Sequence, residues 1–288
     1  MTAELLGLLD LRNVDKGIFS GAPAQDPRAR VFGGHVLAQA LAAACFTAPE
    51  GWPCHSLHAY FLRPGKPGRP IDYEVAAMRD GSSFATRKVV AVQRDEVNLE
   101  LIASFQQDEP APEHQPTMPE TPPPESFPGE EERTAQMLEM APPALREQVA
   151  RRRPVEMIRV EPRSFTDRAP VVAPIRTWMR TRSPLMDDPN LHRCALAYAS
   201  DMGAIEPALR AIGANFGDGA MQVASLDHAL WFHRPFRFDD WLLFVFEPVS
   251  VAGGRGLSRG SVWSRDGRLV ASIAQEGVMR TRSETAAT

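Results

Sequence analysis

The sequence contains few cysteines and no excess of positive charge, and each shortage excludes a class of protein. Cys45, Cys54 and Cys194 are the only cysteines in 288 residues, too few and too scattered for a disulfide framework or a zinc ribbon. Lys and Arg number 32 against 36 Asp and Glu, a net charge of −4, which excludes a generically basic nucleic-acid binder. We therefore expect no nucleic-acid partner, although a local basic patch remains open.

Long hydrophobic runs are also absent. The longest apolar stretches, such as residues 36–46, fall well short of the roughly 20 residues that span a membrane. The first residues lack the basic and apolar segments of a secretory signal, and the last six, SETAAT, form no peroxisomal address. We expect a cytoplasmic protein with no membrane partner, and unpaired cysteines agree with a reducing compartment.

Proline, in contrast, is abundant and unevenly distributed. Of the 26 prolines, eight fall within residues 108–128. This segment can donate few backbone hydrogen bonds and favours extended structure. Short helices are predicted after it, over residues 130–140 and 143–153, separated by Pro142 and Pro143. The chain length predicts about two domains, and the proline-rich segment would connect them.

The two flanking segments resemble each other, which indicates a tandem duplication. The motif His58-Ala-Tyr-Phe-Leu-Arg-Pro64 returns as His228-Ala-Leu-Trp-Phe-His-Arg-Pro235, with an offset of 171 between the Arg-Pro pairs. Three more anchors follow in the same order at nearly the same offset: Arg87 with Arg259, Arg94-Asp95 with Arg265-Asp266, and Ala103-Ser104 with Ala271-Ser272. We predict repeats at 1–107 and 155–288, joined by a linker with short helices at 108–154.

Each repeat is predicted to fold as one helix followed by a run of strands. The helices are expected over residues 34–47 and 203–212. The strands are expected at 55–62, 71–79, 84–93 and 99–107, and then at 225–232, 241–249, 260–264 and 269–279. Arg-Asp-Gly at 79–81 and 265–267 predicts hairpin turns, because Asp-Gly tolerates a positive φ. One helix and a meander, twice over, predicts an α+β fold rather than an alternating βαβ sheet.

Two glycine-rich motifs favour structural explanations over catalytic ones. Residues 256–260 match the G-x-S-x-G pattern of serine hydrolases, but a strand pattern follows Ser258 and every histidine precedes it. Gly254-Arg-Gly256 precedes no helix, so it is no dinucleotide loop. We interpret this segment as the start of a strand.

The histidine pairs and Cys54 also have structural interpretations. His55 and His58, like His228 and His233, point to opposite faces of a strand at their spacings, and no cluster completes a tetrahedral metal site. Cys54 and His55 point apart as neighbours, whereas a nucleophile and its base must meet. We favour hydrogen-bonded histidines, a buried cysteine and no bound metal.

Longer stretches carry a specific family signal. They are Val31-Phe-Gly-Gly34, His58–Gly65 and Arg79–Phe84, then Tyr198-Ala-Ser-Asp201, Leu226–Phe236 and Gln275–Arg280. Over nearly the whole chain these ordered matches resemble the acyl-CoA thioesterase II (TesB) family. The resemblance implies an α+β tandem hotdog, in which each repeat wraps an antiparallel sheet around a central helix. It also implies an acyl-CoA substrate, no cofactor, and a homo-oligomer, either a dimer or a tetramer.

The resemblance further implies a catalytic Asp, hydroxyl and Gln. Matched motif by motif, these fall on Asp201, expected at a helix start, on Ser225, and on Gln275 in the last strand. Many members have Thr at the Ser225 position, and serine keeps the hydroxyl with a less restricted rotamer. Such a set can orient one water and accept its proton, which implies hydrolysis of fatty acyl-CoA by an activated water.

The start of the first helix is expected to contribute backbone N–H groups. The amides of Gly33, Gly34 and His35 would form the oxyanion site there. In the first repeat the catalytic set is not repeated, since Gly33-Gly34-His35 stands in the region of Asp201 and Cys54 in the position of Ser225. Gln107 is the candidate match for Gln275. The second repeat is therefore expected to carry the chemistry.

Alternatives remain open at each position and for the function. From the residues alone, Asp201 reads as a helix N-cap, Ser225 as an edge-strand hydroxyl and Gln275 as a solvated strand residue. A non-catalytic acyl-CoA binding or sensor protein is one alternative function, suggested by the shorter hydroxyl of Ser225. A hotdog enoyl-thioester hydratase is another, but such enzymes resemble an Asp with a His five positions on, where this chain has Glu206.

Overall fold

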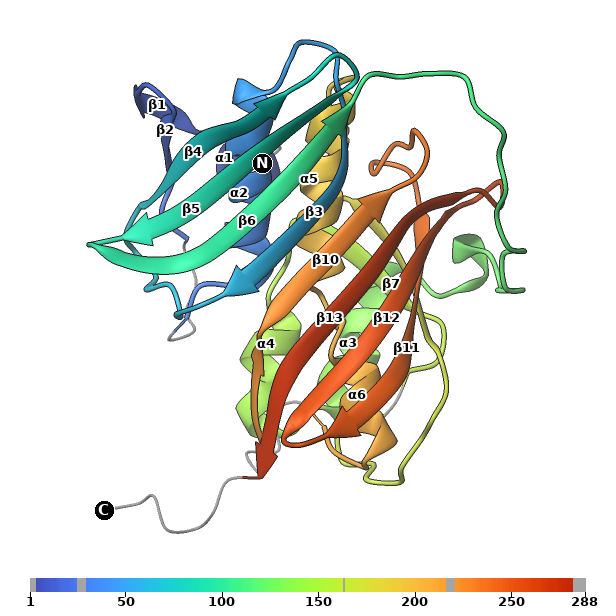
Figure 1. The fold of residues 1–288 in the computed structure, drawn as a ribbon. Coiled ribbons are helices and arrows are strands. Elements are labelled where there is room, and N and C mark those ends of the chain that lie inside the picture. Colours follow the sequence, from blue (N-terminus) through green and yellow to red (C-terminus); the bar gives the residue numbers. More distant parts are fainter. Residues whose placement is uncertain (1–3, 25–29, 163, 216–220, 282–288) are drawn as a thin grey trace.

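A long antiparallel sheet organises the molecule. The computed structural model describes residues 4–24, 30–162, 164–215 and 221–281. The strand order is β1-β2-β4-β5-β6-β3-β10-β13-β12-β11-β8-β7, and β9 pairs with β13 outside this path. The second six strands mirror the first six about the contact between β3 and β10, where the two halves lie edge to edge (Figure 1). A duplicated unit whose copies join at one edge produces this order.

The predicted strands are present with shifted limits. The first half contains β1 (Arg12–Asp15), β2 (Ile18–Gly21), β3 (Cys54–Phe61), β4 (Ile71–Asp80), β5 (Phe84–Gln93) and β6 (Glu96–Gln106). The second contains β7 (Val155–Arg159), β8 (Ile175–Thr181), β9 (Met221–Ser225), β10 (Asp227–Phe232), β11 (Leu242–Ala252), β12 (Arg255–Ser264) and β13 (Leu269–Thr281). The pairs β1–β2 and β7–β8 were not predicted, because strands of four to seven residues carry little alternation.

Two buried helices form the centre of the fold. Helix α2 (Gly33–Thr47) confirms the first-half prediction, and its counterpart α5 (Pro189–Ser200) packs against it. The prediction of the second central helix at 203–212 is wrong, because only the short α6 (Glu206–Ala211) lies there. Helix α5 begins earlier, where the Asp188 side chain accepts a hydrogen bond from Asn190 N–H and Pro189 occupies the first turn.

The remaining helices are short and lie outside the centre. They are α1 (Glu4–Leu9), α3 (Glu130–Met140) and α4 (Arg146–Ala150), with single turns η1 (Pro124–Ser126) and η2 (Pro143–Leu145). The helix predicted at 130–140 is therefore confirmed, and the one predicted at 143–153 is shorter than expected. No helix in the described part of the chain is long and apolar enough to cross a membrane.

The two Arg-Asp-Gly sequences lie at hairpins but differ in backbone geometry. Gly267 has a φ of +80° between β12 and β13, as predicted. Gly81, between β4 and β5, has no positive φ, so that expectation is wrong there. The turn between β5 and β6 instead places Arg94 and Asp95 at φ values of 51° and 62°.

The proline-rich segment covers the outer face of the second-half sheet. Strand alternation turns one set of apolar side chains away from α5. Met118 and Phe127 of the segment pack on these side chains. The set consists of Ile158, Trp178, Trp241, Leu243, Val245 and Trp263. The Trp178 indole N–H also donates a hydrogen bond to the Pro122 carbonyl at 2.9 Å. The segment is thus packed against the sheet and shields its tryptophans from water.

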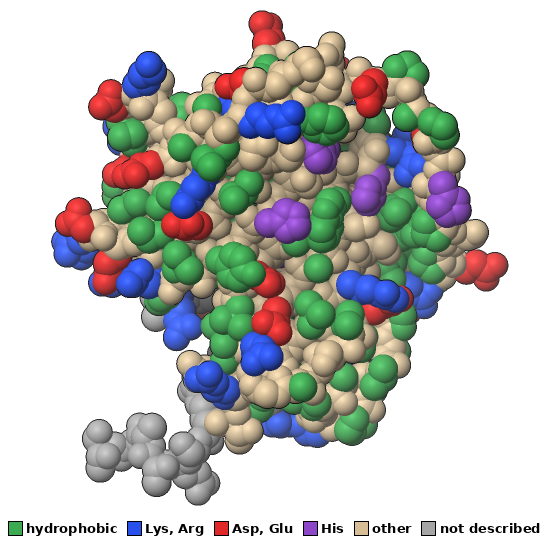
Figure 2. Space-filling model, viewed as in Figure 1, with side chains coloured by type: hydrophobic (Ala, Val, Ile, Leu, Met, Phe, Trp, Pro, Cys, Tyr) green, Lys and Arg blue, Asp and Glu red, His purple; other side chains and the backbone are tan. Residues whose placement is uncertain are grey.

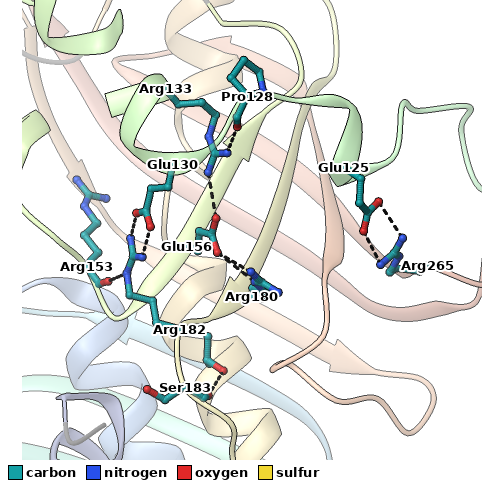
Figure 3. A network of polar contacts seen from close by, with 11 residues as sticks. Glu125, Pro128, Glu130, Arg133, Arg153, Glu156, Arg180, Arg182, Ser183 and Arg265 are labelled. Carbon is teal, nitrogen blue, oxygen red and sulfur yellow. Dashed lines mark hydrogen bonds and ion pairs between the residues drawn. The ribbon is translucent and has the colours of Figure 1, made fainter. Parts of the chain in front are cut away.

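Ion pairs attach the same region to the second half (Figure 3). Glu125 pairs with Arg265 and Glu130 pairs with Arg182. Glu156 on β7 bridges Arg133 of α3 and Arg180 of β8, at 3.1 and 3.0 Å. Elsewhere acidic and basic side chains are interspersed on the visible face, without a large patch of one sign (Figure 2).

Candidate active site

The three side chains expected to be catalytic meet where the two halves join. Asp201 follows α5, Ser225 ends β9, and Gln275 lies in β13. Gln275 Nε2 lies 2.8 Å from Asp201 Oδ1 and 2.7 Å from Ser225 Oγ, and donates a hydrogen bond to each. Asp201 is the C-cap of α5, so its expected place at a helix start is wrong for the same reason that the helix prediction is wrong.

The start of α2 reaches this group from the first half. The Gly34 N–H donates to Asp201 Oδ2 at 2.8 Å, so both carboxylate oxygens accept hydrogen bonds from the protein. A Cβ added to Gly33 would lie 2.7 Å from Asp201 Oδ2, and a Cβ added to Gly34 would lie 2.3 Å from the Tyr198 carbonyl oxygen. Glycine at both positions therefore permits the close approach, and the positive end of the α2 dipole stabilises the carboxylate.

Two of the backbone amides expected at the oxyanion site have protein partners. The Gly34 N–H binds Asp201, and the His35 N–H donates to the Phe32 carbonyl at 3.0 Å. A Cβ on Gly33 would meet Asp201 Oδ2 and the Phe61 ring. The oxyanion role of Gly33, Gly34 and His35 stays a prediction, and the geometry adds a second role for Gly34, which is to orient Asp201.

The hydrogen bonds continue from Gln275 to His228, which the sequence indicated only as a hydrogen-bonded residue. His228 Nδ1 lies 2.7 Å from Gln275 Oε1, and His228 Nε2 lies 2.8 Å from Ser200 Oγ. All three side chains are at most 1% exposed. The signal that could have found His228 is its place in β10, where it lies on the same face as the buried Leu230 and Phe232 and so points to the interior.

Acidification is expected to destabilise the protein through His228. Burial lowers the pKa of His228 from 6.5 to about 4, so the unfolded chain binds more protons between these values. The contribution of the neutral His228 ring to the free energy of unfolding is fully present above about pH 6.5. It is lost as the pH falls toward 4, by at most about 1.4 kcal/mol per pH unit. Urea unfolding of the wild type and His228→Asn from about pH 7 to about pH 5 measures it. The variant should lose less stability over this range, and equal losses would contradict the prediction.

Strand pairing shows which first-half residues occupy the positions of Ser225, His228 and Gln275, and these residues carry no hydroxyl, imidazole or amide. Cys54 is the first residue of β3 and pairs with Phe105 of β6. Ser225 is the last residue of β9 and pairs with Gly277 of β13, the counterpart of β6. The offset of 171 places Leu57 at the position of His228, and Leu57 pairs with Ala103. Ala229 pairs with Ala274 in the antiparallel second half, so His228 lies opposite Gln275. This register replaces the sequence alignment of Ala103 with Ala271. Ala103, rather than Gln107, therefore occupies the position of Gln275.

The other motifs behave as structural elements. Ser258 lies in β12 directly opposite Gln275 and is 1% exposed, and its hydroxyl has no hydrogen-bond partner among the described residues. His55 and His233 are hydrogen bonded to Ser104 and Ser272, both at 2.8 Å. Cys54 is fully buried. Within the described residues, no three His, Cys, Asp or Glu side chains are placed to hold a metal ion.

Comparison with known proteins identifies the family. A model described as the acyl-CoA thioesterase N-terminal domain matches residues 22–106, and one described as the C-terminal domain matches residues 112–279. The chain belongs to the acyl-CoA thioesterase family. Both halves are recognised separately, in agreement with the mirrored sheet.

Individual thioesterases match over nearly the full length. Acyl-CoA thioesterase 2 of Haemophilus influenzae is 38% identical over 277 residues, which cover 96% of this chain and 97% of that protein. Acyl-coenzyme A thioesterase 8 of Homo sapiens is 37% identical, covering 96% of this chain and 89% of that protein. The crystal structure of acyl-CoA thioesterase II TesB2 from Mycobacterium marinum has a TM-score of 0.78 at 38% identity, covering 97% of this chain and 99% of that one.

A more distant structure bears on the fold alone. A hot dog fold protein from Alicyclobacillus acidocaldarius has a TM-score of 0.75 at 22% identity, and the match covers 97% of this chain and 98% of that one. The expected α+β tandem hotdog is thereby confirmed for this thioesterase. Its central helices are α2 and α5, which pack against each other, and their buried side chains share one hydrophobic core with the strands.

Proposed function

We propose that this thioesterase hydrolyses fatty acyl-CoA to a free fatty acid and CoA, with a water molecule activated by Asp201. Membership of the family makes the protein a thioester hydrolase. The observation that carries the mechanism is the group of hydrogen bonds in which Gln275 Nε2 joins Asp201 to Ser225 and Gly34 N–H holds the same carboxylate. Asp201 and Ser225 are half-buried, so substrate can approach them, while Gln275 lies beneath.

The donors and acceptors suit activation of water. Both hydrogens of Gln275 Nε2 are engaged, so Ser225 Oγ accepts one of them and its own hydroxyl hydrogen is directed elsewhere. A water between Ser225 and Asp201 would attack the thioester carbonyl carbon while its proton passes to Asp201. The tetrahedral intermediate then releases its carbon–sulfur bond electrons to sulfur, and Asp201 returns the proton to the departing thiolate. The start of α2 would stabilise the intermediate's oxyanion.

Thiol release from acyl-CoA substrates of different chain lengths tests the proposed activity. We expect the purified protein to release CoA thiol from fatty acyl-CoA and Asp201→Asn to be nearly inactive. Equal release by both proteins would contradict the role of Asp201. Tight binding of every substrate without turnover would instead favour an acyl-CoA binding or sensor protein.

Two serines beside β13 provide a matched test of the hydroxyl. Ser225→Ala is expected to lower kcat by about 10- to 100-fold, because it removes the hydroxyl that accepts from Gln275 and faces the water. Ser258→Ala removes an equally small group on the other side of Gln275, but that hydroxyl has no polar partner, so kcat should stay within about twofold. Steady-state kinetics of the two variants measure both kcat values. Similar losses in both would contradict a catalytic role of the Ser225 hydroxyl.

We further propose a cytoplasmic location and a homo-oligomer, with repeats at 1–107 and 155–288 joined by the segment 108–154. The unpaired cysteines support a reducing compartment. Exposed Tyr60 and Ile102 on β3 and β6 support an association surface, since they are 61% and 49% exposed. Light scattering after size exclusion measures the oligomer, and a monomer at all concentrations would contradict this part of the proposal.

A further inference from the structure

The side-chain amide of Gln275 must adopt one of two orientations to serve the proposed reaction. An amide has nearly the same shape when its oxygen and nitrogen are exchanged, so only hydrogen bonds distinguish the orientations. With Nε2 toward Asp201 and Ser225, the amide donates to both. With the amide reversed, Oε1 would face the Asp201 carboxylate oxygen at the same 2.8 Å separation, and two acceptors would oppose each other.

His228 lies at the other end of this amide and has two neutral tautomers. Burial lowers the pKa of His228 to about 4, so one ring nitrogen carries hydrogen at neutral pH and the other accepts. Hydrogen on Nδ1 lets the ring donate to Gln275 Oε1, 2.7 Å away, which requires the productive amide orientation. Hydrogen on Nε2 would make Nδ1 an acceptor and would favour the reversed amide.

Ser200 lies at the other ring nitrogen and matches the tautomer with hydrogen on Nδ1 when it donates, since a hydroxyl can either donate or accept. Its Oγ lies 2.8 Å from His228 Nε2 and 2.9 Å from the Ala197 carbonyl, and its single hydrogen can serve only one of them. When Ser200 donates to Nε2, the ring hydrogen must lie on Nδ1. Because the Asp201 carboxylate can only accept, the direction of donation runs from Ser200 through His228 and Gln275 to Asp201, and the buried side chains of Ser200, His228 and Gln275 all have matching partners.

We propose that His228, with hydrogen on Nδ1, is a positioning residue that holds the Gln275 amide with its nitrogen toward Asp201 and Ser225. The inference rests on the proposed function of these three residues. The strand register supports it, because the first half replaces both partners together: the pair Leu57 and Ala103 of β3 and β6 stands where β10 and β13 have His228 and Gln275. An apolar residue at the first position accompanies the loss of the amide at the second.

A pair of amide substitutions separates positioning from packing. In His228→Asn the new amide nitrogen lies near the position of Nδ1 and can still donate to Gln275 Oε1, whereas in His228→Gln it lies near Nε2 and cannot. We expect His228→Asn to keep kcat within about fivefold of wild type, and His228→Gln to lower it at least about 30-fold with KM within about twofold. Ser200→Ala should fall between them. Equal kcat values for the two His228 variants, whether both are high or both are low, would overturn the inference.

The tautomer provides a readout that needs no turnover. Nitrogen-15 NMR of the wild-type imidazole rings at neutral pH, assigned by the signal missing in His228→Asn, should show hydrogen on Nδ1 of His228. Hydrogen on Nε2 would overturn the inference even in an active enzyme. Failure of the proposed function is distinguishable, because it would appear as full activity of Asp201→Asn or as no hydrolysis by the wild type, with the ring tautomer still measurable.

Discussion

Replacement of Asp201 by asparagine is expected to lower kcat for acyl-CoA hydrolysis by about two to four orders of magnitude. Asparagine has almost the same shape, so the hydrogen bond from the Gly34 N–H can persist. An amide cannot take a proton from water, however, and its NH2 group would oppose the Nε2 of Gln275, now 2.8 Å from Asp201 Oδ1. Thiol release under steady-state conditions measures the loss, and KM should change little.

The control for this variant is its stability. The replacement is nearly isosteric, so its free energy of unfolding should fall by no more than about 1–3 kcal/mol for the opposed amide groups, and urea unfolding should still show a folded protein under assay conditions. Ser258→Ala is a second control, because it changes a buried side chain directly opposite Gln275 and should leave kcat nearly unchanged. Wild-type kcat in Asp201→Asn would exclude Asp201 as the proton acceptor.

Replacement of Gly34 by alanine is expected to lower the free energy of unfolding by about 2–4 kcal/mol. The added Cβ would lie 2.3 Å from the Tyr198 carbonyl oxygen and 2.5 Å from the Phe32 ring. The carbonyl belongs to the backbone of α5, so the two central helices must separate to admit one methyl group. The same displacement would move the Gly34 N–H from Asp201, and kcat should fall with stability.

Gly7→Ala is the matched control for this substitution. Gly7 lies in α1, and an added Cβ there meets no atom within 4 Å. Since alanine favours helix over glycine, this variant should be unchanged or more stable by up to about 1 kcal/mol. If Gly34→Ala unfolds at the same urea concentration as wild type, α2 does not approach α5 as closely as described.

Local patterns were sufficient for much of the secondary structure. The limits of β5 and α3 agree with the prediction because strand alternation, turn residues and a proline boundary are signals within a few neighbouring residues. Helix α5 escaped prediction because its sequence mixes His192 and Arg193, both buried, with small apolar residues, whereas α2 is rich in alanine and leucine. The prediction placed the second central helix at the short α6 instead, because Glu206-Pro207 is typical of a helix start.

The candidate catalytic residues depended on the family resemblance rather than on spacing. Gln275 is 74 residues from Asp201 and 50 from Ser225, so no local pattern connects them. Each of the three also has an ordinary structural interpretation when it is considered alone. His228 escaped functional notice for a related reason, since its partners are on β13 and at the end of α5, and only the packed sheet places them within hydrogen-bond distance.

The sequence by itself determined that the chain is a duplicated α+β unit, which side-chain types could perform thioester hydrolysis, and that the first repeat lacks a Ser225 hydroxyl. Only the tertiary structure decided that β3 and β10 join the halves, that Asp201 ends a helix, and that the Gly34 N–H from the other half holds it. The physical reason is distance along the chain. A hydrogen bond between groups 167 residues apart forms only because two buried helices pack closely enough to exclude a single methyl group.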